Sequence, residues 1–252
     1  KGAISVAATY DGGTGTLLID GSTDQSFTVA SGAVLPNIIL NNSLTTISYA
    51  AAATSTLNGL ILQAGTFTST SGTLTLAGNF IQSGGTFNHN SGTVTLNTTS
   101  TLNVTGAFNN LTINGSSITV TLGGNLDVNG TLTLTAGTLD VSTSNYTINV
   151  AGGWTDTGTA AFTEQTGTVT LDGTQTLNSN EAFYHVTINA PAGTVTLGNT
   201  LTVSGNLTIS AGTLDVSGTN YAVTVSNDFS NSGTFTAQSG TVTLSGTTAA
   251  IL

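Results

Sequence analysis

One phrase recurs along the chain at nearly constant spacing, and this recurrence limits the possible folds. SGTVTLNTTS at 91–100 returns as TGTVTLDGTQ at 166–175 and SGTVTLSGTT at 239–248, and GTLLIDG at 15–21 follows the same pattern. The glycines that open the phrase are Gly15, Gly92, Gly167 and Gly240, so the intervals between successive copies are nearly equal. Such repetition predicts identical units that bury their apolar faces against their neighbours. The repeats span 15–91, 92–166 and 167–239, and a fourth starts at 240–252.

Inside each repeat, hydrophobic residues alternate with Thr or Ser, as in TVTL, TLTLT and NLTIS. A period of two is typical of a β-strand with one buried side. Gly, Asn and Ser separate these segments, and these residues tolerate the left-handed backbone conformations that turns require. The sequence therefore predicts an all-β fold without helices.

Two all-β architectures fit this pattern. In a right-handed parallel β-helix, or β-solenoid, residues 1–252 form one continuous domain with aliphatic side chains inside and Thr, Ser and Asn outside. In the alternative, tandem small β-sandwich modules, each repeat of about 75 residues is short beside the roughly 100 residues of an immunoglobulin-like unit. The short strands and the absence of long crossing connections favour the solenoid. With about 20 residues per coil, it would be a rod of roughly 55 to 65 Å.

Composition excludes several classes of partner. The chain has one basic residue, Lys1, against eleven acidic residues, which gives a formal net charge of −10. A nucleic-acid binder needs Lys and Arg to neutralise phosphates, so nucleic acid is excluded as a partner, and an anionic membrane surface is equally disfavoured. No apolar run approaches the roughly 18 residues of a membrane span, so we expect no membrane insertion.

The phrases GNLTISAGTLDVSG at 205–218 and NGTLTLTAGTLDVS at 129–142 carry a resemblance to a known group of proteins. They are similar to the repeats of filamentous-haemagglutinin-type exoproteins, autotransporter passengers and related prokaryotic surface proteins. The resemblance covers nearly the whole chain and implies a right-handed β-helix displayed outside the cell. The repeats of those adhesins are shorter, single-coil units, whereas the repeat here is much longer and leaves the number of coils open.

The repeat also serves as an internal control for catalytic chemistry, because a catalytic residue should differ from its counterparts in the other repeats. His185 aligns with Asn37 and Asn110, and His89 aligns with Glu164 and Ala237. Both histidines therefore occupy variable, exposed positions.

The acidic residues also fail to indicate catalysis. Asp140 and Asp215 recur at matching positions, where we interpret them as caps of turns. The chain has no Arg, and the spaced carboxylates of a Ca²⁺-binding β-roll are missing. We expect no enzymatic activity, no metal and no cofactor.

Two further sets of residues recur, one of aromatic residues expected inside and one of Thr residues expected outside. Trp154 aligns with Phe80 and Phe229, and we interpret the three as a core aromatic layer. The many TxT segments favour a third, weaker hypothesis, ice binding through rows of Thr. Against it, Asn, Asp and Ser interrupt the rows when the repeats are compared with one another, and Thr is in any case a favoured strand residue.

Neither end of the chain has a recognisable cap, and an uncovered terminal coil exposes a strand edge that recruits another chain. We therefore predict a structural extracellular or cell-surface protein, a subunit of a filament or stalk that assembles head to tail with copies of itself. An adhesin segment that binds a host surface or a glycan is the alternative. The predicted assembly interface consists of Ile4, Val6, Ala8, Tyr10, Val242, Leu244, Ile251 and Leu252.

Overall fold

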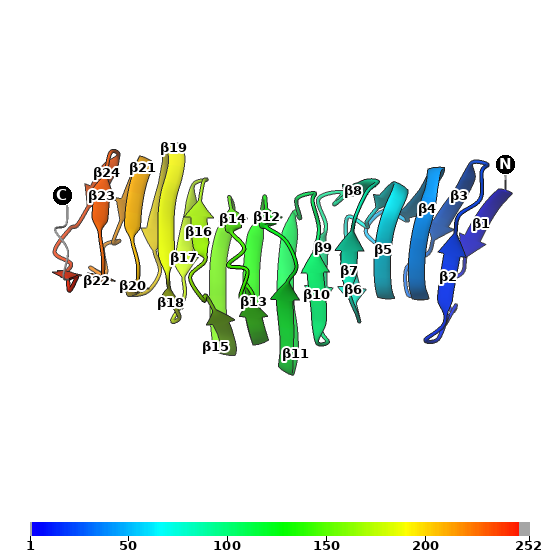
Figure 1. The fold of residues 1–252 in the computed structure, drawn as a ribbon, viewed down its shortest axis with the longest axis horizontal. Coiled ribbons are helices and arrows are strands. Elements are labelled where there is room, and N and C mark those ends of the chain that lie inside the picture. The colour runs from blue at the N-terminus through cyan, green and yellow to red at the C-terminus, as the bar shows by residue number, and fades with distance from the viewer. Residues whose placement is uncertain (1, 247–252) are drawn as a thin grey trace.

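Parallel strands stacked coil upon coil form the described part of the chain, residues 2–246, in the computed structural model (Figure 1). About 11 turns follow one another, and the pairings among these residues are parallel throughout. The all-β solenoid is therefore confirmed. The alternative of tandem sandwiches is wrong, because sandwich sheets are built from antiparallel strands.

The strands follow one another with short turns between them. In chain order they are β1 (Gly2–Val6), β2 (Thr16–Ile19), β3 (Gln25–Val29), β4 (Val34–Tyr49), β5 (Thr54–Thr68), β6 (Thr73–Leu76), β7 (Phe80–Gln82), β8 (Thr86–Asn88), β9 (Thr93–Leu96), β10 (Ser100–Asn103), β11 (Asn110–Leu122), β12 (Leu126–Val128), β13 (Thr131–Asp140), β14 (Ile148–Val150), β15 (Gly153–Thr163), β16 (Thr168–Leu171), β17 (Gln175–Asn178), β18 (Ala182–Phe183), β19 (His185–Leu197), β20 (Leu201–Val203), β21 (Leu207–Asp215), β22 (Val223–Val225), β23 (Phe229–Asn231), β24 (Thr234–Thr236) and β25 (Val242–Leu244).

The pairings arrange these strands into three faces, which we number in the order of winding, beginning with the face that contains β2. Longer strands bend around a corner and contribute to two or three faces. Face 1 contains β2, β7, β10, β18, β20, β22 and β25 with the middle of β4 and β5 and the ends of β11, β13 and β15; face 2 contains β1, β3, β8, β12, β14, β16 and β23 with the ends of β4 and β5 and the starts of β19 and β21; face 3 contains β6, β9, β17 and β24 with the starts of β4, β5, β11, β13 and β15 and the ends of β19 and β21.

The coils differ in length. Thr93 pairs with Asn110 one coil later, whereas Gly2 pairs with Gln25, so the first coil is clearly the longer of the two. The corners absorb the difference, since the strands of successive coils stay in register while the turns between them lengthen or shorten. With about 11 turns at a strand spacing of about 4.8 Å, the rod is about 50 Å long.

The repeated phrase does not stack on its own copies. Leu17 in the first copy lies on face 1, Val94 on face 3, Val169 on face 2 and Val242 again on face 1. Each repeat therefore winds through three full turns and two thirds of a fourth. Three repeats bring the phrase back to the face on which it began.

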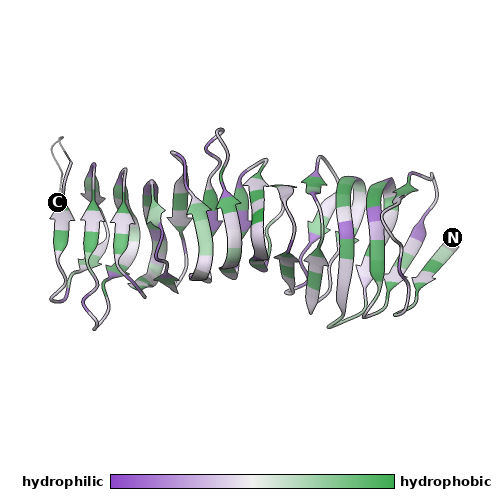
Figure 2. Ribbon diagram, turned by 90° about the horizontal axis from the view of Figure 1, so that it is seen from below, coloured by the Kyte–Doolittle hydropathy of each residue, from purple (hydrophilic) through white to green (hydrophobic). Residues whose placement is uncertain are grey.

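Inward-facing aliphatic side chains form the core, and their positions follow the period of two. Hydrophobic residues accordingly appear as bands along the strands in Figure 2. On face 3 the buried residues pair in register from coil to coil. They are Leu57, Leu76, Leu96, Ile113 and Leu134, each at most 1% exposed. Burying each such side chain contributes about 1.5–3 kcal/mol to the free energy of unfolding.

Three groups of aromatic rings interrupt this aliphatic core, and Phe80, Trp154 and Phe229 each belong to one of them. All three residues are buried. Trp154 contacts Phe162 and Phe183 at centroid distances of 5.0 and 5.2 Å. Phe80 contacts Phe87 and Phe108 at 5.0 and 6.1 Å, and Phe229 contacts Phe235 at 5.4 Å. The groups recur once per repeat, each on a different pair of faces. In each group one contacting ring belongs to the same repeat, and Phe108 and Phe183 belong to the following one.

Local turns also recur at the same positions in successive repeats. Ser142 and Asn145 have φ angles of 61° and 57°, and Ser217 and Asn220, at the same places in the next repeat, have 63° and 62°. The two turns occupy different corners of the solenoid, so the local sequence determines their shape. Gly212 precedes the strand segment that leads into the second of these turns, and it also has a positive φ, of 84°. A Cβ at Gly212 would lie 2.1 Å from the backbone oxygen of Ala190 in the preceding coil.

Candidate functional surfaces

The first coil leaves apolar side chains uncovered at one end of the rod. Ile4 and Tyr10 are 43% and 44% exposed, and Ala8 is also exposed, whereas Val6 is buried at 7%. A groove of about 480 Å³ opens there. Its apolar lining includes Ile4, Val6, Tyr10, Leu17, Phe27 and Leu35. We call this groove and its lining the N-terminal end surface.

The opposite end is less apolar. In β25, which pairs with β22, Val242 is half-buried and Leu244 is 37% exposed. Phe235 of β24 is partly buried against the core. The remaining two residues of the predicted interface, Ile251 and Leu252, lie outside the described residues. The two ends of the rod are far apart, so the predicted interface residues form two separate surfaces (Figure 1).

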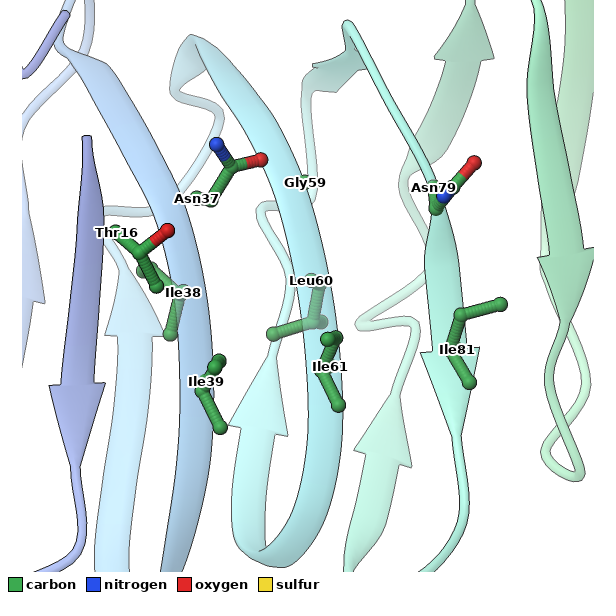
Figure 3. Close-up of a pocket in the computed structure, with 9 residues that line it drawn as sticks. All are labelled: Thr16, Asn37, Ile38, Ile39, Gly59, Leu60, Ile61, Asn79 and Ile81. Atoms are coloured by element: carbon green, nitrogen blue, oxygen red, sulfur yellow. The ribbon is translucent and has the colours of Figure 1, made fainter. Parts of the chain in front are cut away.

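Sequence reasoning missed a row of outward aliphatic residues on face 1. Leu18, Ile39, Ile61 and Ile81 pair in register across four coils, and Leu18 and Ile61 are 53% and 37% exposed. Figure 3 shows the last three projecting from neighbouring strands. The signal was present, because LLI, IIL and LIL place aliphatic residues on both sides of the strand. We call these four residues the aliphatic row.

A shallow notch of about 190 Å³ lies beside the aliphatic row, where Gly59 separates Asn37 from Asn79 (Figure 3). The side-chain amide of Asn37 donates to the carbonyl oxygens of Thr14 and Gly15 at 3.3 Å. The amide oxygen of Asn79 accepts a hydrogen bond from the backbone N–H of Thr101 at 2.7 Å. These amides thus link one coil to the next, and the notch gives little indication of a ligand site.

Face 3 carries two parallel rows of Thr, which we call the threonine rows. The inter-coil pairings place the hydroxyl-bearing residues side by side from β5 to β15. One row is unbroken over six coils and contains Thr56, Thr75, Thr95, Thr112, Thr133 and Thr155; the other contains Thr54, Thr73, Thr93 and Thr131, with Asn110 between the last two.

The comparison of repeats predicted interrupted rows. On face 3 one row is unbroken from β5 to β15, whereas Asn110 interrupts the other. The comparison assumed that the copies of the phrase stack on one another. Because successive copies lie on different faces, residues that align in the repeat are not neighbours in the solenoid.

Both histidines accept hydrogen bonds from backbone N–H groups. His185 Nδ1 accepts a hydrogen bond from the backbone N–H of Asn206 at 2.9 Å, and His89 Nδ1 accepts one from Ser91 at 2.9 Å. Asp140 and Asp215 likewise accept from the backbone N–H groups of residues 142 and 217, at 2.8 and 2.9 Å. His89 and the two aspartates cap local turns, as the sequence suggested for the aspartates, whereas His185 links one coil to the next.

Asp156 is the exception among the acidic residues, because it points into the core. It is 5% exposed and occupies the inward position that Leu134 fills in the preceding coil. The hydroxyl of Ser179 donates to its Oδ2 at 3.3 Å. Burial raises the pKa of Asp156, the charge of Glu181 raises it further, and the Ser179 hydrogen bond offsets part of this. Because its folded-state pKa is raised, ionised Asp156 opposes folding.

The acidic residues do not gather into a metal site. Within residues 2–246, no three His, Cys, Asp or Glu side chains lie close enough together to hold a metal ion. A membrane-spanning helix is likewise not found in that part of the chain.

No protein-family model, no curated protein sequence and no solved structure matches this chain. The β-solenoid repeat architecture is therefore established by the strand pairings alone. The function has to be inferred from the surfaces described above.

Proposed function

We propose that this chain is a structural module of an extracellular or cell-surface protein: a stiff rod that stacks end to end with other copies of itself in a filament or stalk. The main support is a difference in exposed side chains between the sides of the rod and the end surface of its first coil. Along most of the rod the outward positions carry short polar residues, whereas the N-terminal end surface exposes Ile4 and Tyr10 around an apolar groove.

The stacking partner that best fits this surface is another coil of the same kind. A parallel strand edge offers backbone donors and acceptors at a fixed spacing, which a further strand satisfies. Leu244 at the other end supplies exposed aliphatic area that a second copy could place against the groove. Such head-to-tail contacts do not close on themselves, so they generate a filament.

The placement of the chain along the rod supports a spacer role as well. β1 and β24 lie at opposite ends of the rod, so a segment attached at one end is held about 50 Å from a segment attached at the other (Figure 1). The extracellular location rests on the resemblance of the repeat phrases to prokaryotic surface proteins.

End-to-end stacking can be tested with variants of matched exposure. Ile4→Asp and Leu244→Asp place a charge at either end, and Ile61→Asp places one on the side of the rod at the same 37% exposure as Leu244. We expect light scattering and negative-stain images of the parent chain to show rods that lengthen with concentration. Ile4→Asp and Leu244→Asp should abolish this lengthening, and Ile61→Asp should leave it intact.

Two outcomes would contradict the proposal. Rods of one length at every concentration would exclude stacking between copies. Loss of association in Ile61→Asp alone would indicate side-by-side contact through the aliphatic row.

A further inference from the structure

The threonine rows form an array that repeats in two directions. Across the coils the side chains are separated by the strand spacing of about 4.8 Å, and along each strand the i and i+2 residues are about 6.7 Å apart. Register shifts occur only beyond these positions, between Ile113 and Asn114 and between Leu134 and Ala136. The strand register is therefore regular across all positions of the two rows.

The chemistry of the array is uniform and rigid. Each Thr presents one hydroxyl and one methyl group, and branching at Cβ restricts the χ1 rotation that would displace them. The Thr side chains of β6, β9 and β11 are half-buried between their neighbours, which holds them further. No charged side chain lies among the positions of the two rows, whose one interruption before β15 is Asn110.

This regularity selects the kind of partner. A soluble sugar is usually held by stacking on aromatic rings in a concave site, and a protein partner requires irregular, complementary relief. The threonine rows offer neither. An array that repeats the same hydroxyl and methyl groups at two fixed spacings fits a partner that is itself periodic in two dimensions. Both spacings are close to repeat distances between oxygen atoms on the surfaces of hexagonal ice.

We propose that face 3 binds ice through the threonine rows from β5 to β15. Hydroxyl groups at these spacings hold a layer of water molecules in ice-like positions, and the methyl groups between them exclude water that does not fit. The proposal is independent of end-to-end stacking, because the rows lie on the side of the rod.

The repeat supplies a matched control for the experiment. Thr95 and Thr112 belong to the threonine rows, while Thr170 and Thr187 occupy the same places in the next repeat but lie on face 2. All four are half-buried and outward-facing. On face 2 the neighbours of Thr168 and Thr170 are His185 and Thr187, so no second row of Thr accompanies them. The double variants T95Y/T112Y and T170Y/T187Y thus make the same chemical change on two different faces.

We expect the parent chain to shape growing ice crystals, to lower the freezing point below the melting point, and to enter a growing ice hemisphere when labelled with a fluorophore at Lys1. T95Y/T112Y should lose most of this effect and T170Y/T187Y should keep it. Circular dichroism establishes that both variants fold.

Three results would overturn the proposal. The parent chain could be excluded from ice and leave crystals unshaped. Both double variants could lose activity equally, which would place the effect elsewhere. Binding to insoluble chitin or cellulose that T95Y/T112Y abolishes, without any effect on ice, would assign the rows to a crystalline polysaccharide.

Discussion

Face 1 and face 3 have the same inside and different outsides. Beneath both, Leu, Ile and Phe side chains pair in register and are buried. On the outside, face 1 carries the aliphatic row over β2, β4, β5 and β7, while face 3 carries the threonine rows over β5 to β15. The comparison teaches that inward residues specify the solenoid and that outward residues are free to differ. Because the coils stack in register, outward residues of the same type in successive coils form a row.

The largest effect is expected when an inward residue and its outward neighbour on face 3 are each replaced. Leu96 is fully buried and Thr95 lies outside, next to it in β9. Leu96→Ala should lower the free energy of unfolding by about 2–5 kcal/mol, because it leaves a cavity in a close-packed core. Thr95→Ala should change it by less than about 1 kcal/mol. Urea unfolding followed by circular dichroism measures both, and equal effects would refute the division between inward and outward residues.

A second test concerns the one acidic residue that breaks the inward pattern. Asp156→Leu restores the residue type that Leu134 supplies one coil earlier, and it should raise the free energy of unfolding at pH 7 by about 1–3 kcal/mol. The pKa of Asp156 is raised in the folded state, so its ionisation opposes folding. Its contribution to stability therefore decreases as pH rises from the unfolded-state pKa of Asp through the folded-state pKa.

The pH dependence separates this explanation from simple packing. Asp156→Leu should remove the part of the stability decrease that Asp156 causes between its unfolded-state and folded-state pKa, and Asp156→Asn should remove it too without adding apolar contacts. If the parent chain and both variants lose stability in parallel over this range, Asp156 is not the group responsible.

Much of the fold could be predicted from the sequence, because strand formation depends on local residues. The period of two placed Leu57 and Leu96 inside, and the recurring turns at residues 142–145 and 217–220 have the same shape on different corners. The inward position of Asp156 was also readable, since it lies two residues after the buried Trp154. That signal was overlooked.

The threonine rows could not be predicted in the same way. They depend on which residues become neighbours across coils, and this depends on coil lengths, which vary along the chain. One repeat also contains no whole number of coils. Comparing repeats therefore paired Thr95 with Thr170, which lie on different faces, whereas its actual neighbours are Thr75 and Thr112.

The smallest effect is expected on the outside of face 1. Ile61→Thr replaces the centre of the aliphatic row with the residue type that face 3 uses, while Leu60 beneath it stays buried. Cross-strand contacts with Ile39 and Ile81 are worth only about 0.2–1 kcal/mol each, and Thr suits an exposed strand position, so the change in the free energy of unfolding should stay below about 1 kcal/mol. The binding of a hydrophobic dye should fall, because the exposed aliphatic row is interrupted.

Thr75→Ile on face 3 is the reciprocal change, and it should have an equally small effect on the free energy of unfolding measured in urea. A decrease of several kcal/mol in the free energy of unfolding of either variant would mean that outward residues help to specify the solenoid. The difference between the two faces would then be required by the fold.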